Sequence, residues 1–122
     1  MKFTKDHEWI KKEGSVAYVG ITDYAQQQLG DIVYVEMAEE NMVLQKGDVL
    51  CAVESVKTAA EVYMPVSGRV LQGNSELEDA PEKVNESPYE AYLAKIAYDD
   101  ESEFDELMTE DEYTEFVESE AK

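Results

Sequence analysis

Apolar and polar residues alternate over most of this chain with the two-residue period of half-buried β-strands. Glycines and short polar clusters separate the alternating stretches, as expected for turns. The stretches that we expect to form strands are residues 3–4, 7–10, 15–21, 31–37, 49–53, 59–64, 69–71 and 89–98. Residues 74–88 are polar and contain two prolines, so we expect a loop with room for one helical turn. The pattern therefore predicts a mainly β fold of short strands.

Helical spacing replaces the alternation over residues 23–29, where Ala25 and Leu29 share one face. Thr22 comes just before this segment and is a suitable N-cap, because its hydroxyl can accept a hydrogen bond from an amide of the first turn. Gly30 follows the segment, where a glycine commonly ends a helix. We therefore expect a short helix between two strands.

A second helical region is predicted after residue 99, where the composition becomes strongly acidic. Ser102 and Thr109 each precede an acidic residue by three positions, which is the capping-box pattern. Apolar residues follow each cap at helical spacing. We expect a single domain over residues 1–122, in which residues 99–122 form an acidic helical extension packed on the β body.

Charge narrows the range of partners. The 122 residues include 29 acids and 10 Lys or Arg residues, which gives a formal net charge of −19. Nucleic acids and anionic membranes bind clustered positive charge, so we expect neither as a partner. We expect a monomer that docks onto the basic rims of larger partners. The polar N-terminus and the lack of a long apolar run predict a cytoplasmic protein without a signal peptide or membrane span.

The sequence offers little for nucleophilic or metal chemistry. Cys51 is the one cysteine and His7 the one histidine, which excludes an intramolecular disulfide and a His-pair zinc motif. A small hydrolase that uses Cys51 and His7 is the enzymatic alternative. However, Cys51 lies between Leu50 and Ala52 in a predicted strand, where a buried, unreactive thiol is the usual finding. We therefore expect no catalytic residue and no metal ligand.

Lys57 is a more informative candidate. It lies between two predicted strands, at the tip of a hairpin that lacks the usual tip glycine. Gly47 and Gly68 frame the hairpin almost symmetrically. Any single lysine is by default a solvated surface residue, and a structural domain with an unmodified lysine is one alternative. A lysine on a rigid tip is nevertheless suited to covalent modification or to a swinging arm, because its flexible stem carries a single amine.

Six motifs in this sequence resemble those of the glycine cleavage H-protein family, in the family's order and spacing. They are HEW at 7–9, GITDYAQ at 20–26, LGDIV at 29–33, ESVK at 54–57, PVSG at 65–68 and VNESPY at 84–89. The resemblance covers essentially the whole chain, including the acidic C-terminal segment. It implies a barrel-sandwich hybrid, the fold of lipoyl and biotinyl carriers, with two packed sheets and short helices.

The resemblance also implies roles for individual residues. Lys57 matches the family's lipoylated lysine, so lipoate is the expected covalent cofactor. The neighbours that we expect the lipoylating enzyme, a lipoate ligase or lipoyl transferase, to recognise are Glu54, Ser55, Val56 and Thr58. Glu8 and Glu61 match acids that line the family's cleft for the loaded arm. A biotinyl carrier is disfavoured, because no methionine flanks the lysine.

The implied function is that of a non-catalytic carrier in the glycine cleavage system. In such a system a glycine decarboxylase (P-protein) loads an aminomethyl group onto the lipoyl arm, and an aminomethyltransferase (T-protein) takes over the one-carbon unit. A dihydrolipoamide dehydrogenase (L-protein) then reoxidises the arm. These three enzymes are the expected partners.

One departure from the family keeps an alternative open. After the Pro-Tyr pair at 88–89 the family usually has Gly-x-Gly-Trp or Glu-Asp-Gly-Trp, whereas residues 90–93 of this chain are EAYL. The segment looks one residue shorter, and Tyr92 replaces the tryptophan. We therefore expect a tighter loop there. The alternative is a paralogue that serves another lipoate-dependent system as lipoyl donor or scaffold.

Overall fold

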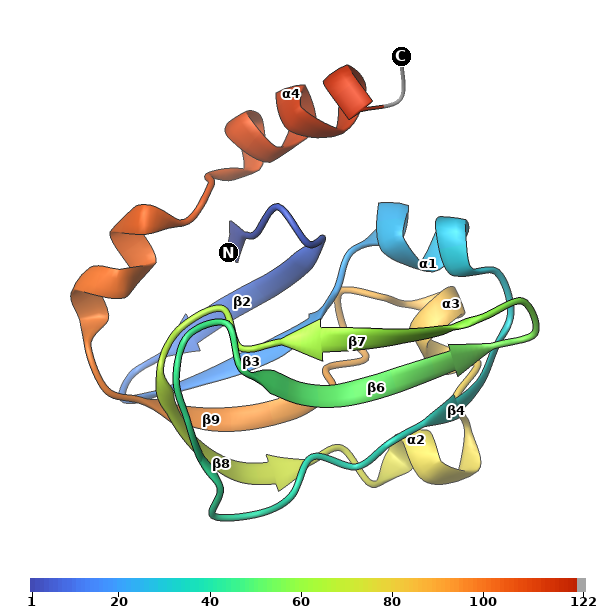
Figure 1. Ribbon diagram of the computed structural model, residues 1–122, viewed down its shortest axis with the longest axis horizontal. Helices are drawn as coiled ribbons and strands as arrows, with labels where there is room; N and C mark the ends of the chain where they lie inside the picture. The colour runs from blue at the N-terminus through green and yellow to red at the C-terminus, as the bar shows by residue number, and fades with distance from the viewer. Residues whose placement is uncertain (121–122) are drawn as a thin grey trace.

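Two antiparallel sheets, packed face to face, form the body of the protein in a computed structural model that describes residues 1–120 (Figure 1). The larger sheet has the strand order β1-β2-β3-β9-β8-β5, and the smaller sheet has the order β4-β6-β7. Within the described residues these ladders stay separate and do not close into a barrel. The prediction of a mainly β fold with two packed sheets and short helices is confirmed.

The strands are short, as the alternating pattern predicts. Those of the larger sheet are β1 (Lys2–Phe3), β2 (Glu8–Glu13), β3 (Val16–Ile21), β5 (Val43–Leu44), β8 (Gly68–Gly73) and β9 (Ala94–Tyr98). Those of the smaller sheet are β4 (Ile32–Val35), β6 (Val49–Ser55) and β7 (Ala59–Tyr63). The helices are α1 (Asp23–Leu29), α2 (Glu76–Asp79), α3 (Lys83–Glu86), the 3-10 helix η1 (Glu101–Glu106) and α4 (Glu110–Glu120).

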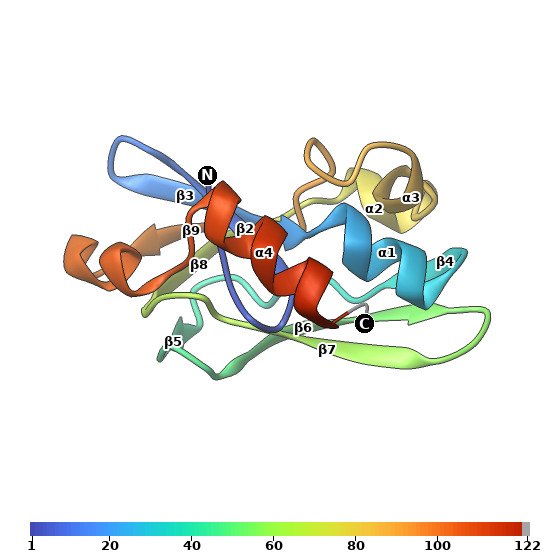
Figure 2. The same ribbon diagram turned by 90° about the horizontal axis from the view of Figure 1, so that it is seen from above.

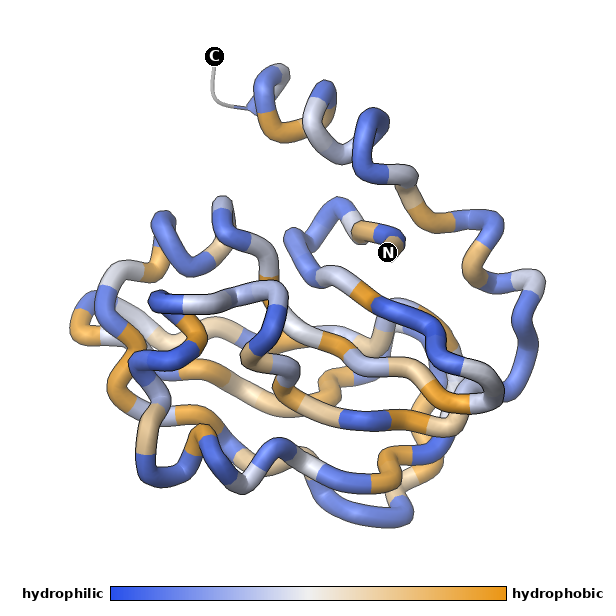
Figure 3. The backbone as a smooth tube through the Cα atoms, turned by 180° about the vertical axis from the view of Figure 1, so that it is seen from behind, coloured by the Kyte–Doolittle hydropathy of each residue, from blue (hydrophilic) through white to orange (hydrophobic). Residues whose placement is uncertain are grey.

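The core lies between the two sheets and consists mainly of β-branched side chains. Its fully buried members include Ile10, Val19 and Ile96 from the larger sheet, and Val35, Val53 and Val62 from the smaller one. Alternate residues of each strand point to this interior, so the strands are apolar on one face and polar on the other. In Figure 3 apolar and polar stretches alternate along the chain, and the C-terminal helix α4 is mostly polar.

Helix α1 begins and ends where the sequence predicts. The hydroxyl of Thr22 accepts a hydrogen bond from the amide of Ala25 at 3.2 Å, which caps the first turn. The amide of Gly30 donates to the carbonyl of Gln26 at 2.9 Å and closes the last turn. The prediction of a short helix between two strands is confirmed.

Three segments differ from the predicted elements. Residues 74–88 contain two one-turn helices, α2 and α3, rather than one turn in a loop. The strand predicted over 89–98 covers only 94–98, because local turns hold the preceding residues: the amide of Ala91 donates to the carbonyl of Ser87 at 2.8 Å. Strand β5 was not expected, since a two-residue strand has no periodicity to detect and exists only through pairing with β8.

The C-terminal segment returns to the start of the chain. Met108 forms an isolated β-bridge with Phe3, and the ring of Tyr113 in α4 stacks on the ring of Phe3 with centroids 4.7 Å apart. Helix α4 therefore lies across the N-terminal strands, as both ribbon views show (Figures 1 and 2). Residues 121–122 of the predicted extension lie outside the described residues.

Of the two helix caps predicted in this segment, one is confirmed and one is wrong. At α4 the hydroxyl of Thr109 accepts from the amide of Glu112, whose carboxylate accepts from the amide of Thr109, so the predicted capping box is confirmed. At η1 the cap is Asp100, not Ser102. The Asp100 carboxylate accepts from both the amide and the hydroxyl of Ser102, so the serine is a donor within the first turn.

Candidate functional site

The hairpin of β6 and β7 ends in a tight turn built around the side chain of Ser55. Its hydroxyl oxygen accepts hydrogen bonds from the amides of Lys57 and Thr58, each at 3.1 Å, and donates to the carbonyl of Thr58. The backbone amide of Ser55 also donates to that carbonyl at 2.7 Å. A serine side chain can replace a backbone turn in this way. Ser55 therefore closes the tip from inside.

This turn explains why the tip needs no glycine. Within residues 1–120 the backbone adopts positive φ at His7, at Asn41 and at three glycines, none of which belongs to the tip itself. Since none of the tip residues requires the left-handed conformation, a β-branched valine and threonine fit beside the lysine. The tip is consequently stiffer than a glycine turn would be.

Lys57 is exposed at this tip. Among the described residues no carboxylate lies within ion-pair distance of its amine. Of the other residues expected to be read by the lipoylating enzyme, Glu54, Val56 and Thr58 are exposed, while the hydroxyl of Ser55 is used within the turn. Val56, which directly precedes the lysine, is 65% exposed.

Glu8, the acid of the HEW motif, is buried, with 2% of its surface exposed. Its carboxylate accepts a hydrogen bond from the hydroxyl of Thr4 at 2.7 Å and another from the amide of Tyr63 at 2.9 Å. Burial raises the pKa of Glu8 from 4.5 to about 7, against these two hydrogen bonds, which lower it, and with a small further rise from Asp6. Glu8 is therefore a carboxyl group poised between its neutral and charged forms near neutral pH.

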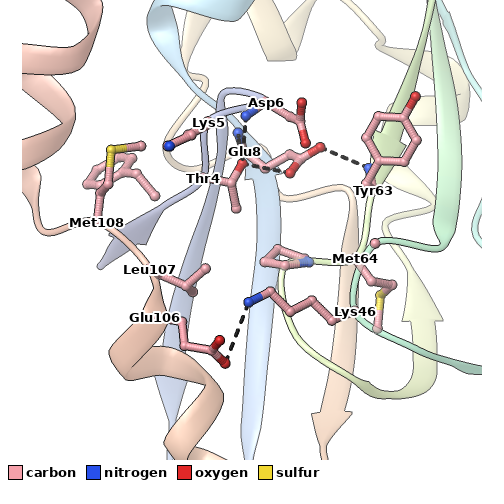
Figure 4. A pocket seen from close by; sticks show the side chains of 13 residues that line it. Thr4, Lys5, Asp6, Glu8, Lys46, Tyr63, Met64, Glu106, Leu107 and Met108 are labelled. Carbon is pink, nitrogen blue, oxygen red and sulfur yellow. Dashed lines mark hydrogen bonds and ion pairs between the residues drawn. The ribbon is translucent and has the colours of Figure 1, made fainter.

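Glu8 forms part of the wall of a cleft of about 530 Å³ (Figure 4). The walls come from four separate parts of the chain: residues 3–6 and 8, residues 46–47, residues 63–65 and residues 106–108. An ion pair between Lys46 and Glu106, 3.6 Å apart, joins two of these walls. The cleft thus combines apolar side chains with a buried acid and a surface ion pair.

Glu61, the second acid expected in this cleft, is exposed and is not among the residues that line it. It precedes Tyr63 by two residues on β7, so the two side chains point to the same side of the strand. Opposite Glu61 on β6 lies Ala52. The structure therefore places Glu61 on the open face of the smaller sheet, between the lysine tip and the cleft. Its role toward the arm stays a prediction.

Cys51 and His7 are occupied in ways that disfavour a hydrolase. Cys51 is 1% exposed, and burial raises the pKa of its thiol to about 12, so the thiolate is not available at neutral pH. The imidazole of His7 contacts the hydroxyl of Tyr113 at 2.8 Å and the carboxylate of Glu120 at 3.1 Å. The expected buried thiol is confirmed, and His7 serves to join α4 to the N-terminal strands.

The segment that departs from the family packs on its own sheet. The ring of Tyr92 lies edge-on to the ring of Tyr18, with centroids 4.9 Å apart. Its carbonyl accepts a hydrogen bond from the side chain of Asn74 at 2.9 Å. Trp9, from the HEW motif, donates its indole N–H to the carbonyl of Pro88 at 2.9 Å. Together with backbone hydrogen bonds such as that from the amide of Leu93 to the carbonyl of Val19, these contacts hold residues 88–93 in place.

Sequence reasoning missed several residues of the site. Lys46, Tyr63 and Glu106 contribute to the cleft, and nothing in their local sequence marks them, because the cleft exists only once four distant segments meet. Asn85 belongs to the VNESPY motif, but the sequence alone assigns no function to its side chain. Only its contacts in the folded chain, described below, suggest one.

A two-sheet fold with an exposed lysine on a stiff hairpin tip agrees with the carrier fold that the resemblance implies. A family model described as glycine cleavage H-protein matches residues 1–120. This chain belongs to the glycine cleavage H-protein family, and the resemblance read from its motifs is confirmed.

Individual relatives agree with this assignment. Proteins named glycine cleavage system H protein from Staphylococcus saprophyticus and Staphylococcus haemolyticus are each 52% identical to this chain over 118 residues, which is 96% of this chain and 94% of theirs. The crystal structure of a glycine cleavage system H protein from Mycobacterium marinum has a TM-score of 0.83 at 30% identity, covering 99% of this chain and 96% of that one. Within residues 1–120 no helix is both long and apolar enough to cross a membrane.

Proposed function

We propose that this chain is the lipoyl-dependent carrier of the glycine cleavage system, with lipoate attached through an amide bond to Lys57. The observation that carries the proposal is the exposed lysine on the tip closed by Ser55, in a member of the H-protein family. The partners are a glycine decarboxylase, an aminomethyltransferase, a dihydrolipoamide dehydrogenase and the enzyme that attaches the lipoyl group. We further propose a cytoplasmic location, on the likeness to the Staphylococcus proteins named glycine cleavage system H protein.

The chain itself catalyses no step in this proposal. When bound, the lipoyl disulfide supplies the chemistry, because it accepts the aminomethyl group and is later reoxidised by disulfide exchange. The hairpin contributes a fixed anchor, so that the arm is confined to a small volume near each active site in turn. The exposed residues Glu54, Val56 and Thr58 are the surface that the lipoylating enzyme reads.

The cleft next to Glu8 is suited to bind the ammonium of the loaded arm while the carrier moves from one enzyme to the next. From Ala59 to Tyr63, whose amide binds Glu8, the strand covers roughly 13 Å at about 3.3 Å per residue, so an arm attached at the tip must reach along the length of β7. An arriving ammonium group would lower the pKa of Glu8 from about 7 and so favour its ionised form. The carboxylate would then be the counter-charge of the ammonium. Glu61 would contribute a second negative charge along the way.

One observation supports a second candidate function. The segment 90–93 lacks the glycines that the family usually has there, and Tyr92 packs on Tyr18. A paralogue that donates lipoyl groups to another lipoate-dependent system, or scaffolds it, would tolerate such a change. A glycine–CO₂ exchange assay with purified glycine decarboxylase decides between the two, since only the glycine cleavage carrier supports exchange.

The modification is tested by intact mass after expression in a host that attaches lipoate. We expect a lipoyl adduct on the wild-type chain and none on Lys57→Arg, which keeps the charge but removes the acylatable amine. Lys46→Arg is the matched control and keeps the adduct, since Lys46 lies on the cleft wall rather than at the tip. An unmodified wild-type chain would refute the carrier proposal, and a biotinyl adduct would replace its cofactor.

The role of Glu8 is tested on the chain loaded with the aminomethyl group. We expect Glu8→Gln to shorten the lifetime of the loaded form by about tenfold, because a charge-assisted hydrogen bond is worth on the order of 1.5–3 kcal/mol. The lifetime is followed by the mass of the adduct over time. An unchanged lifetime in a folded Glu8→Gln protein would exclude the proposed pairing. Glu61→Gln, measured alongside, shows whether the exposed acid contributes.

A further inference from the structure

The tip that carries Lys57 rests on the turn that joins α1 to β4. The amide of Val56 donates to the carbonyl of Asp31 at 3.0 Å, one step beyond the last strand pair, Ile32 with Ser55. The stem of Lys57 lies directly over Gly30. A Cβ atom added at Gly30 would stand 3.1 Å from the Cε atom of Lys57 and 3.7 Å from its Nζ atom. Both ribbon views place this turn beside the hairpin tip (Figures 1 and 2).

The turn has a backbone conformation that glycine alone adopts readily. Gly30 has φ 83° and ψ −156°, a region that is closed to residues with a Cβ atom. Its missing side chain therefore has two effects: the chain can turn sharply after α1, and the stem of Lys57 can lie against backbone. A strained turn persists only where its surroundings hold it in place.

Asn85, in the one-turn helix α3, supplies that hold. Its side-chain oxygen accepts a hydrogen bond from the amide of Ile32 at 2.9 Å. Its side-chain nitrogen donates to the carbonyl of Gly30 at 2.9 Å and to the side-chain oxygen of Gln26 at 2.8 Å. The amide group thus binds the turn on both sides of Asp31, whose own carbonyl holds Val56. The side chain of aspartate would keep the acceptor and lose both donors.

We propose that Asn85 is a positioning residue for the modification of Lys57: it fixes the 30–31 turn, and the turn in turn fixes the direction of the lysine stem. This inference rests on the proposed function. In the modification the Nζ amine attacks an activated lipoyl carbonyl, an adenylate or a thioester; the amide bond forms as the bond to the activating group breaks, and the amine proton passes to water. A lysine whose stem is already held in one direction by the turn reaches this geometry with less loss of freedom.

The chain offers a matched control for this residue. Asn74 also makes side-chain hydrogen bonds to backbone, accepting from Glu76 and donating to the carbonyl of Tyr92, and it is 8% exposed. It touches neither the 30–31 turn nor the hairpin tip in any of these contacts. Asn74→Ala therefore removes a comparable set of hydrogen bonds elsewhere in the fold, and reports the effect of a general loss of stability.

The experiment measures lipoylation of the full-length folded chain by a lipoate ligase supplied with lipoate and ATP. We expect kcat/KM to fall roughly tenfold in Asn85→Ala and in Asn85→Asp, and to stay near the wild-type value in Asn74→Ala. We also expect faster hydrogen exchange at the amide of Val56 in the Asn85 variants alone. Acetylation of Lys57 by a small amine-reactive ester should not slow down, because the amine stays exposed.

Three results would overturn the inference. Equal kcat/KM values in the wild type and the Asn85 variants would show that the turn does not position the lysine. An equal loss in Asn74→Ala would assign the effect to general stability. Slower chemical acetylation in the Asn85 variants would mean that the amine is masked rather than misdirected. By contrast, a wild-type chain that the ligase does not modify at all would overturn the proposed function together with the inference.

Discussion

At the scale of single residues, Glu8 shows how burial sets the chemistry of a side chain. Its neighbours supply two hydrogen bonds, yet they do not offset the loss of water, and the pKa rises to about 7. An unfolded chain would leave this carboxyl near its ordinary value of 4.5. The folded state therefore holds a proton on Glu8 that the unfolded state has already released over this range of pH.

This proton makes stability depend on pH. Well below pH 4.5 Glu8 is neutral in both states, so it contributes no pH dependence. As pH rises from 4.5 to about 7, the unfolded state releases its proton first and is favoured. The difference is about 1.36 kcal/mol per unit of pKa difference, or about 3 kcal/mol in total. We expect the free energy of unfolding of Glu8→Gln to fall less over this range of pH, because glutamine does not ionise. Urea unfolding at about pH 5 and about pH 8, followed by the fluorescence of the buried Trp9, measures it.

Glu61→Gln is the control for this prediction, because it removes a carboxylate that is exposed rather than buried. Removing that charge should leave the difference between the two pH values close to that of the wild type. If both variants changed the difference by the same amount, the effect would come from overall charge and not from the burial of Glu8.

Local sequence could reveal some of these residues and not others. Lys57 was predicted because the alternation on both sides defines a hairpin, and the hairpin defines its tip. The acid Glu8 came only from the resemblance to the family, and its burial could not be predicted, since the residues that cover it lie at 63–65 and 106–108. Asn85 could not be given a role either, because its partners at 26, 30 and 32 lie more than fifty residues away.

At the scale of whole elements, helix α4 is defined by its own first turn. Thr109 and Glu112 satisfy each other's backbone amides, and no basic residue occupies the last turn to offset the helix dipole. Three acids in the first turn are placed favourably with respect to that dipole. The stability of α4 therefore depends mostly on its N-terminal end and on its contacts with Phe3 and His7.

We expect Thr109→Ala to destabilise α4 by about 1 kcal/mol, the usual cost of losing an N-cap. Hydrogen exchange at the amides of residues 113–118 measures the local effect. Thr114→Ala is the control within the same helix: its hydroxyl only donates back to the carbonyl of Glu110, and alanine is the better helix former. Exchange that is faster in Thr114→Ala than in Thr109→Ala would contradict the cap.

The elements that sequence could predict are those whose signals lie within a few residues. The caps at Thr22 and Thr109 are of this kind. Strand β5 depends on pairing with β8, and the late start of β9 depends on turns that tie residues 87–93 together. At η1 both Asp100 and Ser102 are residue types that can cap a helix. Asp100 is the cap, because its carboxylate accepts two hydrogen bonds from Ser102 and a charged acceptor binds more strongly than a hydroxyl.

At the scale of the whole molecule, the net charge of −19 opposes the compact state. Added salt shortens the Debye length from about 30 Å at about 0.01 M to about 8 Å at about 0.15 M and screens this repulsion. Salt also weakens surface ion pairs such as Lys12 with Glu101, but an exposed pair is worth only about 0–1 kcal/mol. The repulsion among many unpaired acids is the larger effect.

We therefore expect the free energy of unfolding to rise between about 0.01 M and about 0.15 M NaCl. Urea denaturation followed by Trp9 fluorescence measures the change. Replacing NaCl by KCl at equal ionic strength should give the same curve, since screening does not distinguish the two cations. A fall in stability over this range would show that the surface ion pairs dominate.

The walls of the cleft beside Glu8 are synthesised at different times, because their residues lie far apart in the chain. A ribosome releases the N-terminal residues first, whereas a domain generally folds as a unit. The sheet residues of the cleft come early, but the wall at Glu106, Leu107 and Met108 comes from near the end of the described chain. The hairpin that carries Lys57 is complete by residue 63. If the proposed function holds, a product truncated before residue 106 would therefore carry its lysine but lack this wall of the cleft.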